Sequence, residues 1–69
     1  MSIKEKIGHR IRFLREEANM SQKDLAYTAD LDRSYIASVE SGKRNISIIN
    51  LEKIANALEI TLNKLFENI

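Results

Sequence analysis

Residues 21–42, SQKDLAYTADLDRSYIASVESG, decide the fold of this chain. Ser21 and Asp32 are residue types that favour the N-cap of a helix. Gly42 is the type that most often follows a helix in the left-handed conformation. The stretch therefore predicts two short helices joined by a tight turn at about residues 29–31. Either the alanine or the aspartate of this turn must take the left-handed position, where glycine is more common.

The second of these helices sorts its side chains onto two faces. At about 100° per residue, Ile36 and Val39 share one face, and small or hydrogen-bonding side chains lie opposite them. The opposite face carries Arg33, Ser34, Ala37, Ser38 and Ser41. An outward face with short side chains and one arginine can lie against the edges of base pairs. This pattern predicts contact with the major groove of DNA.

Apolar residues recur at three- and four-residue steps in the rest of the chain, which is typical of amphipathic helices. The first stripe, in a helix of about residues 3–18, consists of Ile3, Ile7, Ile11, Leu14 and Ala18. The second follows a Ser47 cap and consists of Ile48, Leu51, Ile54, Ala55 and Leu58. A last short helix follows a Thr61 cap. Five helices in 69 residues predict an all-α fold.

Length and composition limit what this protein can be. Sixty-nine residues make one domain, residues 1–69, with a small core that a partner chain would help to stabilise. The absence of cysteine excludes disulfides, and His9 alone cannot form a zinc site. No apolar run approaches the roughly 20 residues of a membrane span, and no signal peptide is visible. We expect a cytoplasmic protein without cofactor, metal or membrane.

Charge is distributed unevenly, although the net charge is only +1. Residues 1–15 carry five basic side chains against one acidic side chain, whereas residues 16–32 carry five acidic against one basic. Arg33, Lys43 and Arg44 form a second basic group. Local positive patches bind phosphates even in a nearly neutral protein. The alternative is that most of these charged side chains only lie on solvent-exposed helix faces and bind nothing.

Several residues around the two short helices have the chemistry of DNA contacts. Gln22 begins the first short helix, where its amide and the free backbone N–H groups suit a phosphate oxygen. Arg33 is the best candidate for a base contact, because arginine pairs bidentately with guanine; the alternative is a phosphate contact. Tyr35 lies between the two faces, so it either packs between helices or touches DNA. The loop Lys43-Arg44-Asn45 is placed to contact phosphates.

The runs SQKDLA (21–26) and IASVESGK (36–43) resemble the helix-turn-helix domain of phage Cro and repressor proteins, the xenobiotic-response-element family. LEKIANAL (51–58) is similar to the pattern that follows in that family. The resemblance extends from the first helix to Phe66 and implies a five-helix, lambda-repressor-like domain. Within the family, LDRSYI (31–36) and the pair Arg44-Asn45 most resemble the controller proteins of restriction–modification systems, which are small dimeric regulators without a ligand-sensing domain.

The resemblance also implies roles for individual residues. It implies base contacts or groove positions for Arg33, Ser34, Tyr35 and Ser38, and phosphate contacts for Gln22, Lys43, Arg44, Asn45 and Ser47. Glu40 matches a buried acidic position of the family and Arg15 its partner on the first helix. This pair would be a structural ion pair that holds the second short helix against the first helix of the domain.

A monomer would expose several large apolar side chains near the C-terminus. These are Ile49, Leu65, Phe66 and Ile69. We predict that they form a homodimer interface within residues 47–69; the alternative is that the last helix folds back and buries most of them. A twofold dimer would present its two recognition helices to half-sites about 34–36 Å apart.

The function predicted from these observations is a sequence-specific transcriptional regulator, repressor and activator, that binds a pseudo-palindromic operator as a homodimer. The resemblance implies that it controls its own restriction–modification operon, with RNA polymerase as a further partner. An enzyme is not expected, because the chain has no nucleophile system, no acid–base pair and no glycine-rich phosphate loop. The alternative is an antitoxin-type regulator whose main role is to bind a partner protein.

Overall fold

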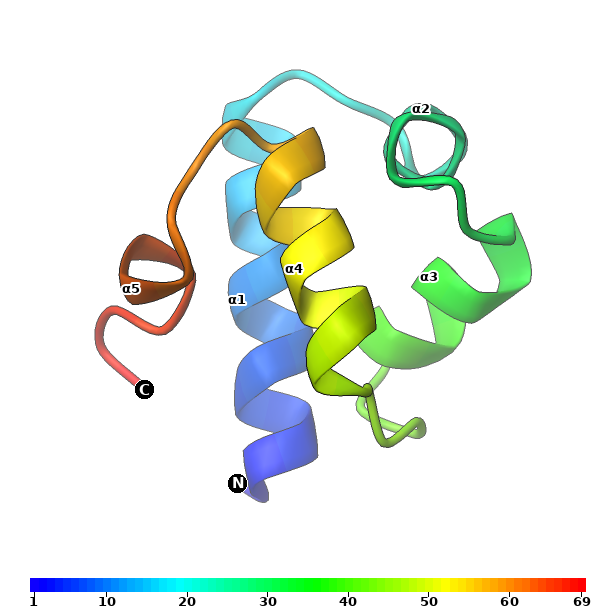
Figure 1. Ribbon diagram of the computed structural model, residues 1–69. Helices are drawn as coiled ribbons and strands as arrows, with labels where there is room; N and C mark the ends of the chain where they lie inside the picture. Colours follow the sequence, from blue (N-terminus) through cyan, green and yellow to red (C-terminus); the bar gives the residue numbers. More distant parts are fainter.

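Five α-helices and no strand make up the computed structural model, which describes residues 1–69 (Figure 1). The helices are α1 (Ile3–Glu17), α2 (Gln22–Ala29), α3 (Arg33–Glu40), α4 (Ile48–Ala57) and α5 (Leu62–Leu65). The observed bounds agree to within one residue with the predicted helix of residues 3–18, the predicted turn at residues 29–31 and the predicted helix starts after Ser21, Asp32, Ser47 and Thr61. No helix is both long and apolar enough to cross a bilayer. The predicted all-α, five-helix fold is confirmed.

Side-chain caps fix where most of the helices begin. Ser21 accepts a hydrogen bond from the N–H of Asp24, whose carboxylate accepts the N–H of Ser21 in return. The first helix has the same reciprocal box between Ser2 and Glu5, which the sequence analysis did not predict. These hydrogen bonds from the cap lower the pKa of both carboxyl groups. Asp32 occupies the predicted N-cap of α3, but its side chain makes no capping bond.

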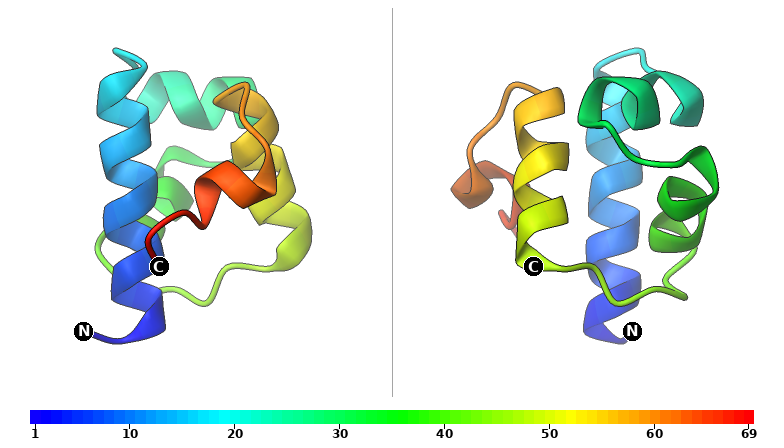
Figure 2. Two further views of the ribbon diagram at one scale, coloured as in Figure 1. Left: turned by 90° about the vertical axis from the view of Figure 1, so that its left-hand side faces the viewer. Right: turned by 45° about the vertical axis from the view of Figure 1, so that its right-hand side comes forward.

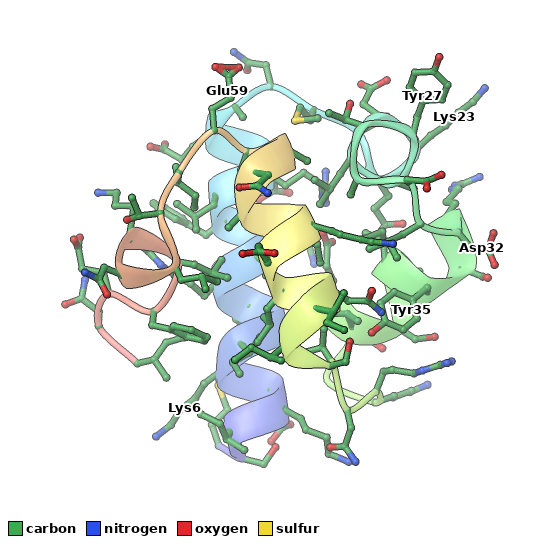
Figure 3. All side chains as sticks on the ribbon, viewed as in Figure 1. Lys6, Lys23, Tyr27, Asp32, Tyr35 and Glu59 are labelled. Atoms are coloured by element: carbon green, nitrogen blue, oxygen red, sulfur yellow. The ribbon has the colours of Figure 1, made fainter.

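The core is formed by apolar side chains from all five helices. It consists of Ile11, Leu14, Leu25, Ala26, Ala29, Ile36, Val39, Leu51, Ile54, Ala55, Leu58 and Leu65. Three residues of the predicted stripes are exposed instead: Ile3 is 58% exposed, Ile48 is 70% exposed, and Ala18, which follows the last residue of α1, is exposed as well. Ile3 and Ile48 each begin a helix at an end of the domain, where no other helix covers the first turn (Figure 1). Tyr27 of α2 is exposed and points away from the domain (Figure 3).

The helices are arranged so that α3 and α5 lie on opposite sides of the domain. In the left view of Figure 2, α5 crosses in front of α1 and α4, and α2 and α3 lie behind them. Accordingly, α1 contacts both α3 and α5, and α4 contacts both α2 and α5. The polar face of α3 is therefore left free by the rest of the fold.

Candidate nucleic-acid interface

Helix α3 is held by its apolar back and presents its polar side to solvent. Ile36 is fully buried and Val39 is 1% exposed, whereas Arg33 and Ser34 are exposed. Gly8 lets α1 approach the back of α3 closely, because a Cβ at this position would lie 2.3 Å from the carbonyl oxygen of Val39. The predicted division of α3 into a buried and an outward face is therefore present in the structure.

The outward face is less accessible in the second turn of α3 than in the first. Ala37 and Ser38 are half-buried, and the hydroxyl of Ser41 donates to the carbonyl oxygen of Ser38 at 3.0 Å. The most accessible side chains for a base edge are therefore those of Arg33 and Ser34 in the first turn. Ser38 lies one turn further along, and its role in base contact stays a prediction.

The turn between α2 and α3 is closed by Asp30, which takes the left-handed conformation with φ 57° and ψ 48°. The sequence left this position open between alanine and aspartate. An aspartate tolerates this conformation better than an alanine does. The next N–H, that of Leu31, donates to the carbonyl oxygen of Ala26 at 2.9 Å, and its side chain packs half-buried against the core. This turn fixes the angle at which α3 leaves α2.

Tyr35 is held between α3, α4 and the loop that joins them (Figure 3). Its hydroxyl accepts a hydrogen bond from Nδ2 of Asn50 at 3.0 Å. The guanidinium carbon of Arg44 lies 4.8 Å from the centre of its ring, within the range of a cation–π interaction. Tyr35 therefore packs at the joint and also supports the side chain of Arg44 in the exposed loop after α3. Its hydroxyl proton stays available for a base or a phosphate.

A buried ion pair fastens α3 to α1. Nε and Nη2 of Arg15 donate to the two carboxylate oxygens of Glu40 at 2.6 and 3.0 Å, and Nη1 donates to the carbonyl oxygen of Met20 at 2.7 Å. The two side chains are 10% and 3% exposed. The hydrogen bonds to Glu40 raise the pKa of Arg15. The structure thus forms the pair that the family resemblance implies.

The side chain of Gln22 also binds the Arg15–Glu40 ion pair. Its Nε2 donates to Oε1 of Glu40 at 3.0 Å, which orients the side chain at the start of α2. From the sequence, this amide is predicted to be free to bind a phosphate. One of its two N–H groups is used by Glu40, so one remains for a phosphate oxygen.

The loop after α3 carries the other predicted phosphate contacts. Lys43, Arg44 and Asn45 are exposed. Gly42 starts the loop in the left-handed conformation, φ 78°, with its backbone against Glu5 of α1. Because a Cβ on Gly42 would lie 2.7 Å from Cγ of Glu5, a larger residue there would displace the loop.

Ser47 ends the loop and caps α4, where its hydroxyl oxygen accepts the N–H of Asn50 at 3.1 Å. Capping uses the oxygen as an acceptor, so the hydroxyl proton can still be donated to a phosphate. Lys4 of α1 lines the same small cavity, about 160 Å³, as Arg44 and Asn45. The start of α1 therefore brings one positive charge, that of Lys4, beside this part of the loop, while the acidic Glu5 lies against Gly42.

The predicted dimer residues differ in where they lie. Ile49 is 66% exposed, Ile69 is 40% exposed and Phe66 is half-buried. Leu65 is fully buried in the core of its own chain, so its assignment to a dimer interface is wrong. The last helix does fold back, as the alternative held, but it buries this one residue completely and leaves the others accessible. Ile48 is exposed beside Ile49 and becomes a further candidate for this interface.

Comparison with known proteins identifies the family. The helix-turn-helix family model matches residues 11–65. Control protein C.MunI from a Mycoplasma species is 48% identical over 68 residues, which cover 97% of this chain and 92% of that protein. This chain belongs to the control proteins of restriction–modification systems. It is therefore a DNA-binding helix-turn-helix regulator.

Solved structures of control proteins have the same fold. The restriction–modification controller protein C.AhdI from Aeromonas hydrophila is 46% identical and superposes with a TM-score of 0.89 over 91% of this chain and 96% of that one. C.Esp1396I bound to a 25 base pair operator site is 39% identical, with a TM-score of 0.89 over 97% of this chain and 88% of that one.

Two residues of this control protein join the candidate interface without having been assigned to it from the sequence. Lys4 belongs to the basic cluster of residues 1–15, so its charge was a usable signal, but only the fold brings it beside Arg44. Asn50 carries no comparable signal, because a polar residue in the first turn of a helix is ordinary. Its contact with Tyr35 joins residues 15 positions apart and depends on how α3 and α4 pack.

Proposed function

We propose that this control protein binds a pseudo-palindromic operator as a homodimer and regulates transcription of its own restriction–modification operon. The observation that carries the proposal is the exposure of Arg33 and Ser34 on a helix whose back, Ile36 and Val39, is anchored in the core. Such a helix can enter a major groove without unfolding any part of the domain. The complex of the related C.Esp1396I with a 25 base pair operator site supports this mode of action.

Each α3 would contact base edges through side chains of its first turn. Arg33 offers two parallel N–H groups, which match O6 and N7 of a guanine. Ser34 can donate to or accept from a neighbouring base. Tyr35 and Ser38 border this surface and would add contacts once the helix is seated.

The contacts to phosphates would surround the base contacts and set the register of the domain on DNA. Gln22 and the free N–H groups of α2 would bind one phosphate, and the loop 43–47 would follow the backbone on the other side. The residues of the loop are Lys43, Arg44, Asn45 and Ser47. The bond from Gln22 to Glu40 and the stacking of Arg44 on Tyr35 support these roles, because they hold both side chains in place before DNA arrives.

Dimerisation would use the apolar side chains at the start of α4 and after α5, namely Ile48, Ile49, Phe66 and Ile69. Helix α5 and the segment after it lie on the side of the domain away from α3, whereas the first turn of α4 lies beside α3 (Figures 1 and 2). The longest dimension of the domain is 27 Å. Two domains side by side can therefore present their α3 helices about 34–36 Å apart, one turn of DNA.

Regulation would follow from occupancy of the operator. A bound dimer blocks RNA polymerase where the sites overlap and assists it where they adjoin. Protein concentration would be the signal, because dimerisation makes binding rise steeply with concentration. The site of action would be the cytoplasm.

A gel shift with the DNA upstream of the protein's own gene tests this function. We expect binding at nanomolar to tens of nanomolar dimer, which is lost when the two half-sites are scrambled. Equal binding to scrambled DNA would contradict it. A pull-down from the native host separates an autonomous regulator from an antitoxin-type protein, which would retain a stoichiometric protein partner.

A further inference from the structure

Arg10 connects α1 to α5 across the side of the domain that faces away from the proposed DNA site. Its Nε donates to the carbonyl oxygen of Leu65 at 3.2 Å, and its Nη2 donates to that of Lys64 at 2.9 Å. These bonds join residues 55 and 54 positions apart in the chain. In the sequence, Arg10 is one of the five basic residues of positions 1–15, and the proposed DNA site does not use it.

Helix α5 depends on such a contact because it is very short. It consists of the four residues Leu62–Leu65, and Leu65 is its only fully buried residue. A single turn is not stable by itself, since nucleation of a helix is unfavourable. The carbonyl oxygen of Leu65 accepts no backbone N–H, so Arg10 is its hydrogen-bond partner. Arg10 thereby satisfies a carbonyl that the end of the helix leaves open.

Phe13 explains why Arg10 points toward α5. The guanidinium carbon of Arg10 lies 5.7 Å from the centre of the Phe13 ring, one turn further along α1. Phe13 is 53% exposed and does not belong to the apolar stripe of α1. Its ring gives the guanidinium one face to lie on while the two N–H groups reach the carbonyls of α5. The three parts form a clamp of ring, guanidinium and carbonyls.

We infer that Arg10 is a positioning residue for dimerisation, which fixes α5 and the following segment, with Phe66 and Ile69, on the body of the domain. The inference rests on the proposed homodimer. Phe66 directly follows the two residues whose carbonyls Arg10 holds, and Ile69 lies three residues further along the chain. If that segment loosens, the apolar surface loses its shape, while α2 and α3, on the other side of the domain, keep theirs.

The effect on dimerisation is amplified by symmetry. If only a fraction of the monomers holds α5 in place, each protomer's contribution to the apparent affinity is multiplied by that fraction. Both protomers must hold α5 in place for the dimer to form. The apparent dissociation constant of the dimer therefore rises with the inverse square of the fraction of monomers that hold it. A fall of about threefold in each protomer therefore weakens the dimer about ninefold.

The test uses Arg10→Ala and Phe13→Ala, with Arg12→Ala as the matched control. Arg12 is on the same helix, but it is exposed and pairs only with Glu16, at 3.3 Å. Sedimentation equilibrium gives the dimer dissociation constant. NMR at a concentration where the protein is monomeric gives the ¹³Cα shifts of residues 62–66 and, for comparison, of residues 33–40. Arg10→Lys tests whether the forked donors matter or only the charge.

We expect Arg10→Ala to raise the dimer dissociation constant about tenfold. Phe13→Ala should raise it by a smaller factor, and the dissociation constant of Arg12→Ala should stay within about twofold of the wild-type value. The shifts of residues 62–66 should move toward random-coil values while those of residues 33–40 stay. Arg10→Lys should be impaired as well, because one ammonium cannot reproduce the fork. An unchanged dissociation constant, or shift changes that extend equally into α3, would overturn the inference. A wild-type protein without any dimer would instead refute the proposed homodimer, and the shifts of residues 62–66 would still test the clamp.

Discussion

The guanidinium of Arg44 lies over the ring of Tyr35, with its carbon 4.8 Å from the ring centre. This contact links the loop after α3 to α3 itself. The hydroxyl of the same tyrosine is held by Asn50 at the start of α4. One side chain thus fixes a proposed phosphate contact relative to the proposed base contacts.

Tyr35→Ala should weaken operator binding more than Tyr35→Phe. Phenylalanine keeps the ring under Arg44 and loses only the bond to Asn50, whereas alanine loses both. A cation–π interaction at an exposed site contributes about 0.5–1 kcal/mol, so we expect the two variants to differ about two- to fivefold in Kd. Fluorescence anisotropy with labelled operator measures this. Equal losses would show that the hydroxyl matters and the stacking does not.

Arg33→Ala should weaken binding to the specific site by about 1–3 kcal/mol and remove base preference at one position in each half-site. The reason is that a bidentate contact to guanine discriminates against the other bases. Competition with a set of single-base operator variants measures the preference. Lys43→Ala is the control. It should weaken binding to all sequences alike and lower the salt slope by about one unit. Unchanged discrimination by Arg33→Ala would assign this arginine to a phosphate.

Glu40→Ala should destabilise the domain by about 3–5 kcal/mol, because it leaves the guanidinium of Arg15 buried without its partner. Urea unfolding followed by circular dichroism measures this. Loss of DNA binding in this variant would therefore reflect folding. An apolar double replacement, Arg15→Met with Glu40→Leu, should recover much of the stability. If the single variant unfolds like the wild type, the pair is not structurally important.

Acid should weaken the start of α2 through Asp24. Hydrogen bonds from Ser21 lower the pKa of this carboxyl below its usual 3.8, so its contribution is complete above that value and is lost as pH falls through the lowered pKa. Wild type and Asp24→Asn should therefore differ in unfolding free energy at about pH 6 and converge at lower pH. Urea titrations across this range test it. A difference that stays constant with pH would exclude the charged capping box as its source.

Ile49→Glu and Leu65→Ala should separate dimerisation from folding. Ile49 is exposed, so a charge there should abolish dimers while leaving the thermal unfolding of the monomer nearly unchanged. Leu65 is fully buried, so its truncation should cost about 2–5 kcal/mol of stability. Analytical ultracentrifugation and thermal denaturation measure the two effects. A dimer that survives Ile49→Glu would place the interface elsewhere.

Most of the candidate site could be predicted from the sequence because it is built from short-range patterns. The spacing of Ile36 and Val39 determines which side of α3 is buried, and the caps at Ser21, Ser47 and Thr61 determine where helices start. Both are properties of a few neighbouring residues. Asp32 is the exception, since it occupies a cap position without making the bond.

The sequence by itself determined the helices, the outward face of α3 and the basic residues around it, because helical periodicity and capping act within one or two turns. Only the tertiary structure decided that Leu65 is buried in its own chain while Ile48 is exposed, since the same apolar residue type suits a core and a surface. It also decided that Asn50 meets Tyr35 and that Arg10 reaches α5. Such contacts depend on the relative placement of helices far apart in the chain, which local patterns do not specify.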